Sequence, residues 1–254
     1  MLNTNFVKII ICSIVLIIII SGVLFYFYNK NAQKESMQNS KEKNVNTNLN
    51  ANLSNSSSTE SGIKNFKIVA FGDSLTAGYG VELKDSYPSI LEEILNSNFK
   101  NKKDVNFEII NMGVSGETTS GGLDRVDFIL EQKPDLILLG LGANDMLRGT
   151  DANVAKNNLD SILKKFKDNN QKVIILGMES VISYGLKYKN DFDAIYPELA
   201  QKYDAPLVPF FLKGVAKVEK YNTSDGIHPN RSGYEKIISE NIMPVLEKYL
   251  SENI

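Results

Sequence analysis

The chain contains very little of the side chains that most often act as bases, thiol nucleophiles or metal ligands. Among 254 residues there is one histidine, one cysteine and no tryptophan. The cysteine is Cys12, so the chain beyond it can form no disulfide and can use no thiol nucleophile. Acid–base chemistry near neutral pH would fall to His228, because no other side chain has an unperturbed pKa in that range. A histidine before a proline can also simply cap a turn.

The charges of the chain favour no polyanionic partner. Lys and Arg number 28 against 30 Asp and Glu, which gives a formal net charge of −2. A nucleic-acid-binding domain normally carries a basic patch or a clear excess of positive charge. Nucleic acid is therefore not among the predicted partners.

The N-terminal part of the chain has the composition of a membrane anchor. Residues 6–28 are almost entirely apolar, and a membrane-spanning helix needs about 20 such residues. The run is longer than the apolar region of a cleaved signal peptide, typically about 7–15 residues, and no Ala-x-Ala site follows it closely. We predict a cytoplasmic stub at residues 1–5 and an uncleaved transmembrane signal-anchor over 6–28. Cys12 is interpreted as part of the span rather than as a lipidation site, because most of the apolar run follows it.

The region after this span divides into a linker and one domain. Residues 29–62 are rich in Asn, Ser, Lys, Glu and Gln and have almost no apolar side chains to bury, so we predict a disordered polar tether. Residues 63–254 have the length and the hydrophobic content of one domain with a substantial core.

Within the domain, short apolar runs alternate with amphipathic stretches. The predicted strands are Phe66–Phe71, Val105–Asn111, Leu136–Leu141, Lys172–Leu176 and Ala205–Val208. The predicted helices are Ser86–Ser97, Thr119–Gln132, Asp151–Lys167, Asp191–Tyr203 and Ser232–Leu250. This alternation indicates an α/β fold in which helices cover both faces of a parallel sheet. Chemistry in such folds gathers at the loops that leave the carboxyl ends of the strands.

Several polar residues follow these strand ends. Ser74 lies in GDSLTAG after the first strand, Gly116 in VSGET after the second, and Asn144 in GAND after the third. Each of them alone is more often a turn or helix-cap residue. Asp225 and His228 follow the last strand, in DGIHPN, where the i, i+3 spacing lets the carboxylate reach the imidazole.

Together these residues supply what acyl transfer requires. The reaction needs a nucleophile, a base, a group that orients the base, and donors for the tetrahedral oxyanion. Ser74, His228 and Asp225 would fill the first three roles. Gly116, through its backbone N–H, and Asn144, through its side-chain amide, would supply the donors.

The motifs also resemble a known family. GDSLTAG, the glycine of VSGET, GAND and DGIHPN are similar, in order, to the four blocks of the SGNH/GDSL hydrolases. GANDMLRG, AIYPELA at 194–200 and APLVPFF at 205–211 resemble the bacterial multifunctional thioesterase/lysophospholipase/arylesterase group in particular. The resemblance covers about Lys67 to Glu240, which is nearly the whole domain.

The resemblance implies a fold and a set of roles. The fold would be a flavodoxin-like three-layer α/β/α sandwich, and the reaction would need no metal and no organic cofactor. Ser74 would be the nucleophile and would also place its own N–H in the oxyanion hole, beside Gly116 and Asn144, with Asp225 and His228 completing the triad. The family also implies export, so we expect a catalytic domain outside the cytoplasm, although Lys8, Lys30 and Lys34 around the span favour the opposite orientation.

The predicted substrates are acyl esters or thioesters, such as lysophospholipids, aryl esters or other fatty-acyl compounds near the membrane. Apolar residues close to the motifs could line an acyl groove, although any one of them could be ordinary core: Leu75, Tyr79, Val181, Ile182, Tyr184, Phe211 and Leu212. One alternative keeps the chemistry and acts on O-acetyl esters of cell-envelope polysaccharide. The other is a non-catalytic binding domain on a membrane stalk, against which the complete set of catalytic residues argues.

Overall fold

The structure is a computed structural model that describes residues 63–99 and 104–254. Its described part contains a parallel sheet with the strand order β2-β1-β3-β4-β5. The strands are β1 (Lys64–Gly72), β2 (Val105–Gly113), β3 (Leu136–Gly140), β4 (Val173–Leu176) and β5 (Leu207–Val208). All neighbouring strands pair in parallel, so their carboxyl ends lie along one edge of the sheet. The strand order reverses between β1 and β3, which makes their carboxyl ends the expected place for a site.

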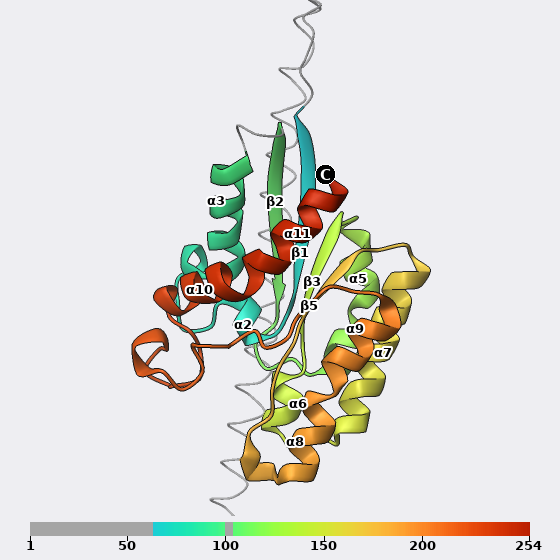
Figure 1. The fold of residues 1–254 in the computed structure, drawn as a ribbon, viewed down its shortest axis with the longest axis vertical. Coiled ribbons are helices and arrows are strands. Elements are labelled where there is room, and N and C mark those ends of the chain that lie inside the picture. The colour runs from blue at the N-terminus through green and yellow to red at the C-terminus, as the bar shows by residue number, and fades with distance from the viewer. Residues whose placement is uncertain (1–62, 100–103) are drawn as a thin grey trace, which may run out of the picture. The chain divides into compact units, whose positions relative to one another are not determined.

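Helices lie on both faces of the sheet (Figure 1). The α-helices are α2 (Ser74–Ala77), α3 (Tyr87–Phe99), α4 (Thr119–Asp124), α5 (Val126–Glu131), α6 (Ala143–Leu147), α7 (Ala152–Asp168), α8 (Leu186–Asp193), α9 (Ile195–Tyr203), α10 (Arg231–Ile237) and α11 (Met243–Asn253). Helices α3, α10 and α11 cover one face, and α4, α5, α7, α8 and α9 cover the other. Right-handed crossover connections place the helices on both faces. From β1 to β2 the chain proceeds toward one edge of the sheet, and afterwards it proceeds toward the other edge.

The hydrophobic core lies between the sheet and these two helical layers. Strand β3 is buried on both sides, as its run LILLG predicts for a central parallel strand. Helix α7 turns an apolar stripe toward the sheet, and its Phe166 ring meets the Phe71 ring of β1 edge-on at 6.2 Å. Edge strand β5 lies between Pro206 and Pro209, which have no N–H to offer a further strand.

Three predicted helices are broken in the structure, and two of the breaks follow from proline. Helix α8 ends at Asp193 because Pro197, four residues later, has no N–H to donate to the Asp193 carbonyl. The C-terminal helix contains a π-helical segment, η4 (Ile238–Ile242), just before Pro244. The predicted helix 119–132 divides into α4 and α5 at Arg125, whose φ and ψ of −101° and 0° are not helical.

The predicted anchor at 6–28 and tether at 29–62 lie outside the described residues, and both stay predictions. Among the helices of 63–99 and 104–254, none has the length and the apolar character that crossing a bilayer requires.

Candidate active site

Ser74 is held at a tight strand-to-helix turn. It is the first residue of α2, directly after β1, and Asp73 caps the helix by accepting a hydrogen bond from the Leu75 N–H at 2.9 Å. The turn requires glycine on two sides. A Cβ at Gly72 would lie 2.6 Å from the Gly140 carbonyl oxygen, and one at Gly113 would lie 2.2 Å from the Ala77 nitrogen. The carboxyl ends of β1, β2 and β3 therefore press directly against the segment that presents the serine.

His228 and Asp225 complete a continuous hydrogen-bonded chain with this serine. The distance from His228 Nε2 to Ser74 Oγ is 2.8 Å, and that from His228 Nδ1 to Asp225 Oδ2 is 2.6 Å. A carboxylate can only accept here, so Nδ1 carries the proton and Nε2 is left to accept from the hydroxyl. The second carboxylate oxygen, Oδ1, accepts from the N–H groups of Ile227 and His228 and from the Thr223 hydroxyl, at 2.8–3.0 Å.

These contacts set the charge of Asp225. Desolvation acts to raise the pKa of its carboxyl, but the N–H groups of His228 and Ile227, the imidazole and the Thr223 hydroxyl outweigh it. Together they hold the pKa of Asp225 well below its usual range. The group that orients the imidazole is therefore ionised across the neutral and mildly acidic range.

The loop that carries this pair is fixed by asparagine side chains. Asn222 and Pro229 form an antiparallel bridge across it, and the Thr223 N–H donates to the His228 carbonyl at 2.8 Å. Asn230 caps α10 by accepting from the Gly233 N–H, and its amide donates back to the Asn222 carbonyl. The loop is thus a closed structure anchored to a helix, which keeps the imidazole in place without regular secondary structure around it.

Gly116 and Asn144 follow the carboxyl ends of β2 and β3, the two strands that flank β1. Gly116 has φ +81°, a left-handed conformation that suits glycine, and its carbonyl accepts from Arg148 Nη2 at 2.7 Å. Asn144 is the second residue of α6, and its side-chain Nδ2 donates to Asp73 Oδ2 at 3.3 Å. The structure therefore joins Asn144 to the residue next to Ser74.

Asp73 is a buried neighbour of Ser74 to which the sequence motifs assign no role in the reaction. Its side chain is 1% exposed. Burial raises the pKa of its carboxyl to about 6, even though the Leu75 N–H, the nearby His228 and the Asn144 amide act to lower it. The one sequence signal for this placement was an acidic residue placed directly before the serine at the end of a buried strand.

Two buried polar groups brace the loops around Gly116 and Asn144. Arg125 binds the Glu117 carboxylate through two nitrogens, at 2.7 and 2.5 Å, and also donates to the Met112 carbonyl. Asp145, next to Asn144, accepts from both the N–H and the hydroxyl of Thr119 at 2.7–2.8 Å. The second and third loops are thereby tied to each other through α4.

Comparison with known proteins places the chain in a family. The model of the GDSL-like lipase/acylhydrolase family matches residues 70–236. The chain belongs to this family. It is therefore a carboxylic ester hydrolase.

Several relatives resemble the chain over most of the domain. An arylesterase of Vibrio mimicus is 37% identical over 72% of this chain and 90% of its own length, and esterase TesA of Pseudomonas aeruginosa is 33% identical over 72% and 89%. Among solved structures, AlinE4, an SGNH-hydrolase family esterase, is 42% identical with a TM-score of 0.60, covering 73% of this chain and 97% of its own. A crystal structure of TesA is 32% identical with a TM-score of 0.66, covering 72% and 98%. The α/β fold with a parallel sheet is thus the fold of SGNH hydrolases.

The predicted acyl-groove residues of this family member fall into three groups. Phe211 and Leu75 are buried. Phe211 packs against Tyr87 with ring centroids 5.4 Å apart, so it is part of the hydrophobic core. Val181 and Leu212 are half-buried against the core. Ile182, Tyr79 and Tyr184 are 58%, 55% and 44% exposed. Only this last group lies open to a ligand.

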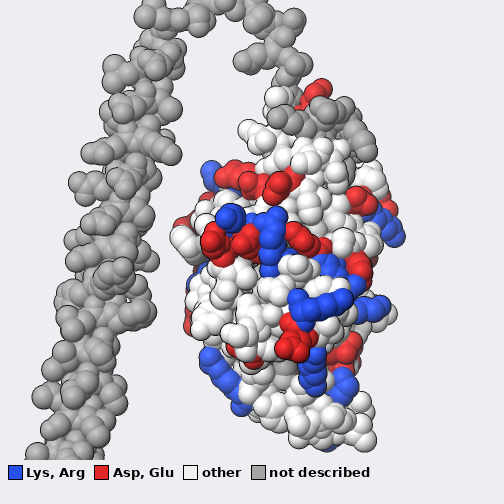
Figure 2. All heavy atoms as spheres, turned by 90° about the vertical axis from the view of Figure 1, so that its left-hand side faces the viewer, with Lys and Arg blue, Asp and Glu red and all other residues white. Residues whose placement is uncertain are grey.

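Tyr79 is the exposed residue with a direct contact to the hydrogen-bonded chain. Its ring lies 4.8 Å from the His228 ring, centroid to centroid, at an interplanar angle of 47°. On another side, the Tyr184 hydroxyl donates to the Leu147 carbonyl at the end of α6. On the face drawn in Figure 2, charged side chains of both signs gather across the middle of the domain, and the lowest tip is mostly uncharged.

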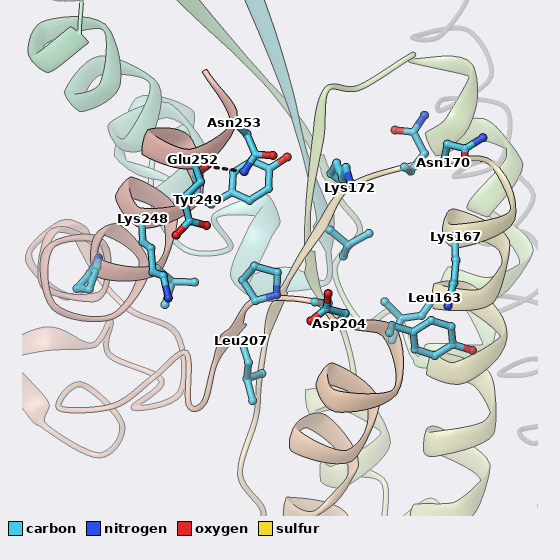
Figure 3. Close-up of a pocket in the computed structure, with 17 residues that line it drawn as sticks. Leu163, Lys167, Asn170, Lys172, Asp204, Leu207, Lys248, Tyr249, Glu252 and Asn253 are labelled. Atoms are coloured by element: carbon cyan, nitrogen blue, oxygen red, sulfur yellow. Dashed lines mark hydrogen bonds between the residues drawn. The ribbon is translucent and has the colours of Figure 1, made fainter.

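A cleft of about 1100 Å³ lies at the opposite edge of the sheet. Figure 3 shows it between the end of α7, with Lys167 and Asn170, and α11, with Tyr249 and Glu252. Lys172 and Val173, at the start of β4, line it, so it faces the amino ends of the strands. Neither the Ser74–His228–Asp225 chain nor the oxyanion candidates line it, and it is not the active site. No cluster of His, Cys, Asp and Glu suited to a metal ion occurs in 63–99 and 104–254.

Proposed function

We propose that this enzyme hydrolyses acyl esters and thioesters with Ser74 as nucleophile, His228 as general base and Asp225 as the orienting carboxylate. The observation that carries the proposal is the unbroken hydrogen-bonded chain from Ser74 Oγ to Asp225, at 2.8 and 2.6 Å. These distances are those required of a base that removes a proton from a nucleophile.

The reaction follows from this arrangement in two stages. His228 Nε2 takes the Ser74 proton as Oγ attacks the ester carbonyl carbon, and Asp225 stabilises the imidazolium that forms. The tetrahedral intermediate then collapses, its alcohol or thiol leaves with the proton held by His228, and an acyl-enzyme remains. In the second stage a water molecule gives a proton to His228 and attacks the acyl carbon, which forms a second tetrahedral intermediate. This intermediate collapses as Ser74 Oγ leaves with the proton held by His228, and the carboxylic acid is released.

The negative charge of both tetrahedral intermediates would be met by three donors. These are the N–H groups of Ser74 and Gly116 and the side-chain amide of Asn144. Each donor of this kind is worth about 10²–10³-fold in rate. The left-handed conformation of Gly116 supports this role, and Arg148 holds the following peptide in place through the Gly116 carbonyl.

The direct test is labelling with a fluorophosphonate, which reacts with activated serines. The wild-type chain should be labelled and Ser74→Ala should not. Ser161→Ala, on the exposed face of α7, is the matched control and should label like the wild type. Absence of label on the wild-type chain would count against the serine-enzyme mechanism.

We propose fatty-acyl esters, including lysophospholipids, as the substrate class. The exposed apolar side chains of Tyr79, Ile182 and Tyr184 support this choice, as do the names of relatives such as the thioesterase 1/protease 1/lysophospholipase L1 of Escherichia coli, 36% identical over 65% of this chain and 76% of its own length. Rates on p-nitrophenyl esters should rise with acyl chain length beyond acetate. A sharp preference for acetate would instead favour an O-acetyl esterase.

We further propose that the apolar run at 6–28 anchors the enzyme, with the catalytic domain outside the cytoplasm and the 29–62 segment as its tether. The full chain should then hydrolyse lipid in vesicles faster than a chain lacking residues 1–62. Both should act equally on a water-soluble ester, which controls for folding. Equal rates on vesicles would refute the role of the anchor.

A further inference from the structure

Asp73 has contacts that a simple helix cap does not need. Its two carboxylate oxygens are used separately: Oδ1 accepts from the Leu75 N–H at 2.9 Å, and Oδ2 accepts from the Asn144 side-chain amide at 3.3 Å. The first contact lies within the nucleophile turn, and the second crosses to the loop after β3. One buried carboxylate thus connects the nucleophile segment with a predicted oxyanion donor.

The contact with Asn144 determines which way its amide faces. A side-chain amide has one NH2 group and one carbonyl oxygen, and only the NH2 group can donate to a carboxylate. While Nδ2 donates one hydrogen to Asp73, its other hydrogen stays available for an oxyanion. If the amide were flipped, its carbonyl oxygen would face the oxyanion in place of the NH2 group and would repel the developing negative charge.

The surroundings of Asp73 make its charge state responsive to pH. The charged or titratable groups that act on it or sense it are His228, Glu117, Tyr87, Tyr196 and Tyr234. His228 favours its ionised form and Glu117 disfavours it. The three tyrosines are buried, and burial raises the pKa of each, so they stay neutral at physiological pH.

We propose that Asp73, in its ionised form, is a positioning residue that holds the Asn144 amide in the orientation required by the oxyanion. The proposal rests on the proposed function, in which Asn144 is an oxyanion donor. Asp73 acts entirely through Asn144 in this proposal, and does not itself contact the reacting atoms.

The substitution Asp73→Asn separates this role from helix capping. Asparagine caps a helix as well as aspartate does. It has only one oxygen, however, and when that oxygen accepts from Leu75 its NH2 group faces the NH2 group of Asn144. Asn144 must then turn its carbonyl oxygen toward residue 73. We expect kcat to fall about 10²–10³-fold, the loss of one oxyanion donor, with little change in KM.

A double-mutant cycle on the full chain tests whether the effect passes through Asn144. Asn144→Ala should cost about as much as Asp73→Asn, and the double variant should be no slower than Asn144→Ala alone. Asp151→Asn is the matched control, because Asp151 caps α7 in the same way, through the Asn153 N–H at 2.8 Å, and it should leave kcat unchanged.

The pH dependence of kcat/KM is a second measurement. A purely structural role of Asp73 would not change it. In the wild type Asp73 must be ionised to hold the Asn144 amide, so kcat/KM should show a loss tied to the Asp73 carboxyl as the pH falls through about 6. In Asn144→Ala the charge of Asp73 no longer matters, and this loss should disappear from the profile.

Two results would overturn the proposal: penalties that multiply in the double variant, or full activity in Asp73→Asn. Neither result bears on the proposed function, which stands or falls with Ser74→Ala.

Discussion

Replacing Asp73 with asparagine should make the domain more stable at neutral pH while it lowers activity. The Asp73 carboxyl is 1% exposed, and its pKa is about 6 against an ordinary value of 3.8. Each pKa unit corresponds to about 1.4 kcal/mol, so the buried negative charge costs about 3 kcal/mol of folding free energy above pH 7. Asparagine fills the same volume and carries no charge.

The sign follows from proton binding. Between pH 3.8 and about 6 the folded chain holds a proton on Asp73 that the unfolded chain has lost. The stabilisation from this group is therefore fully present below pH 3.8 and is lost as the pH rises through about 6. The asparagine of the variant does not titrate, so the stability of the variant relative to the wild type should rise by about 3 kcal/mol between pH 3.5 and pH 7.5.

Urea unfolding at these two pH values measures the effect. Far-UV circular dichroism is the suitable probe, because the chain has no tryptophan for fluorescence. Comparing the two pH values removes any constant difference in hydrogen bonding between the side chains. A stability difference that is the same at both pH values would refute the reasoning. Asp225→Asn is an internal control of opposite sign, since the pKa of Asp225 is lowered and its stabilisation is lost as the pH falls.

Four further predictions concern residues already described. A histidine-directed reagent should inactivate the enzyme in proportion to modification of His228, the one histidine of the chain, and full activity after complete modification would exclude it as the base. Asp225→Asn should lower kcat about 10⁴-fold with the fold intact by circular dichroism, because the imidazole loses its orienting carboxylate. Tyr234→Phe should lower the free energy of urea unfolding by about 1–3 kcal/mol, because the buried Leu75 carbonyl loses its 2.9 Å partner. Gly116→Ala should lower kcat and destabilise the domain by about 1–2 kcal/mol, because alanine resists a φ of +81°; a fully active and equally stable variant would contradict this.

The sequence predicted the strands well because their burial follows from composition. The apolar runs predicted all five strands. A predicted strand was too short wherever the actual strand continues into polar residues. Strand β1 begins at Lys64, which is exposed and pairs with Val105, two residues before the apolar run starts. Backbone pairing with β2 extends the strand there, and hydrophobicity gives no sign of it.

In the candidate site, too, short motifs predict some residues, whereas the roles of others depend on contacts between positions far apart in the sequence. The motifs named Ser74, Asn144 and His228, and the structure brings the serine and the histidine together. The role of Asp73 could not be predicted, because its partner Asn144 is 71 positions away and its burial comes from packing against distant elements. Helix α6 was also missed, since its five residues are too few to show a helical period.

The distance along the chain between Ser74 and His228, 154 residues, has a consequence for how the enzyme is made. A ribosome completes the nucleophile turn, Gly116 and Asn144 long before it adds the base. Nascent chains and chains shortened by an early stop or by proteolysis before residue 228 therefore lack a base and cannot hydrolyse esters by this mechanism. Activity by this mechanism thus requires synthesis through the last loop, and a fragment that ends before that loop has no base for the reaction.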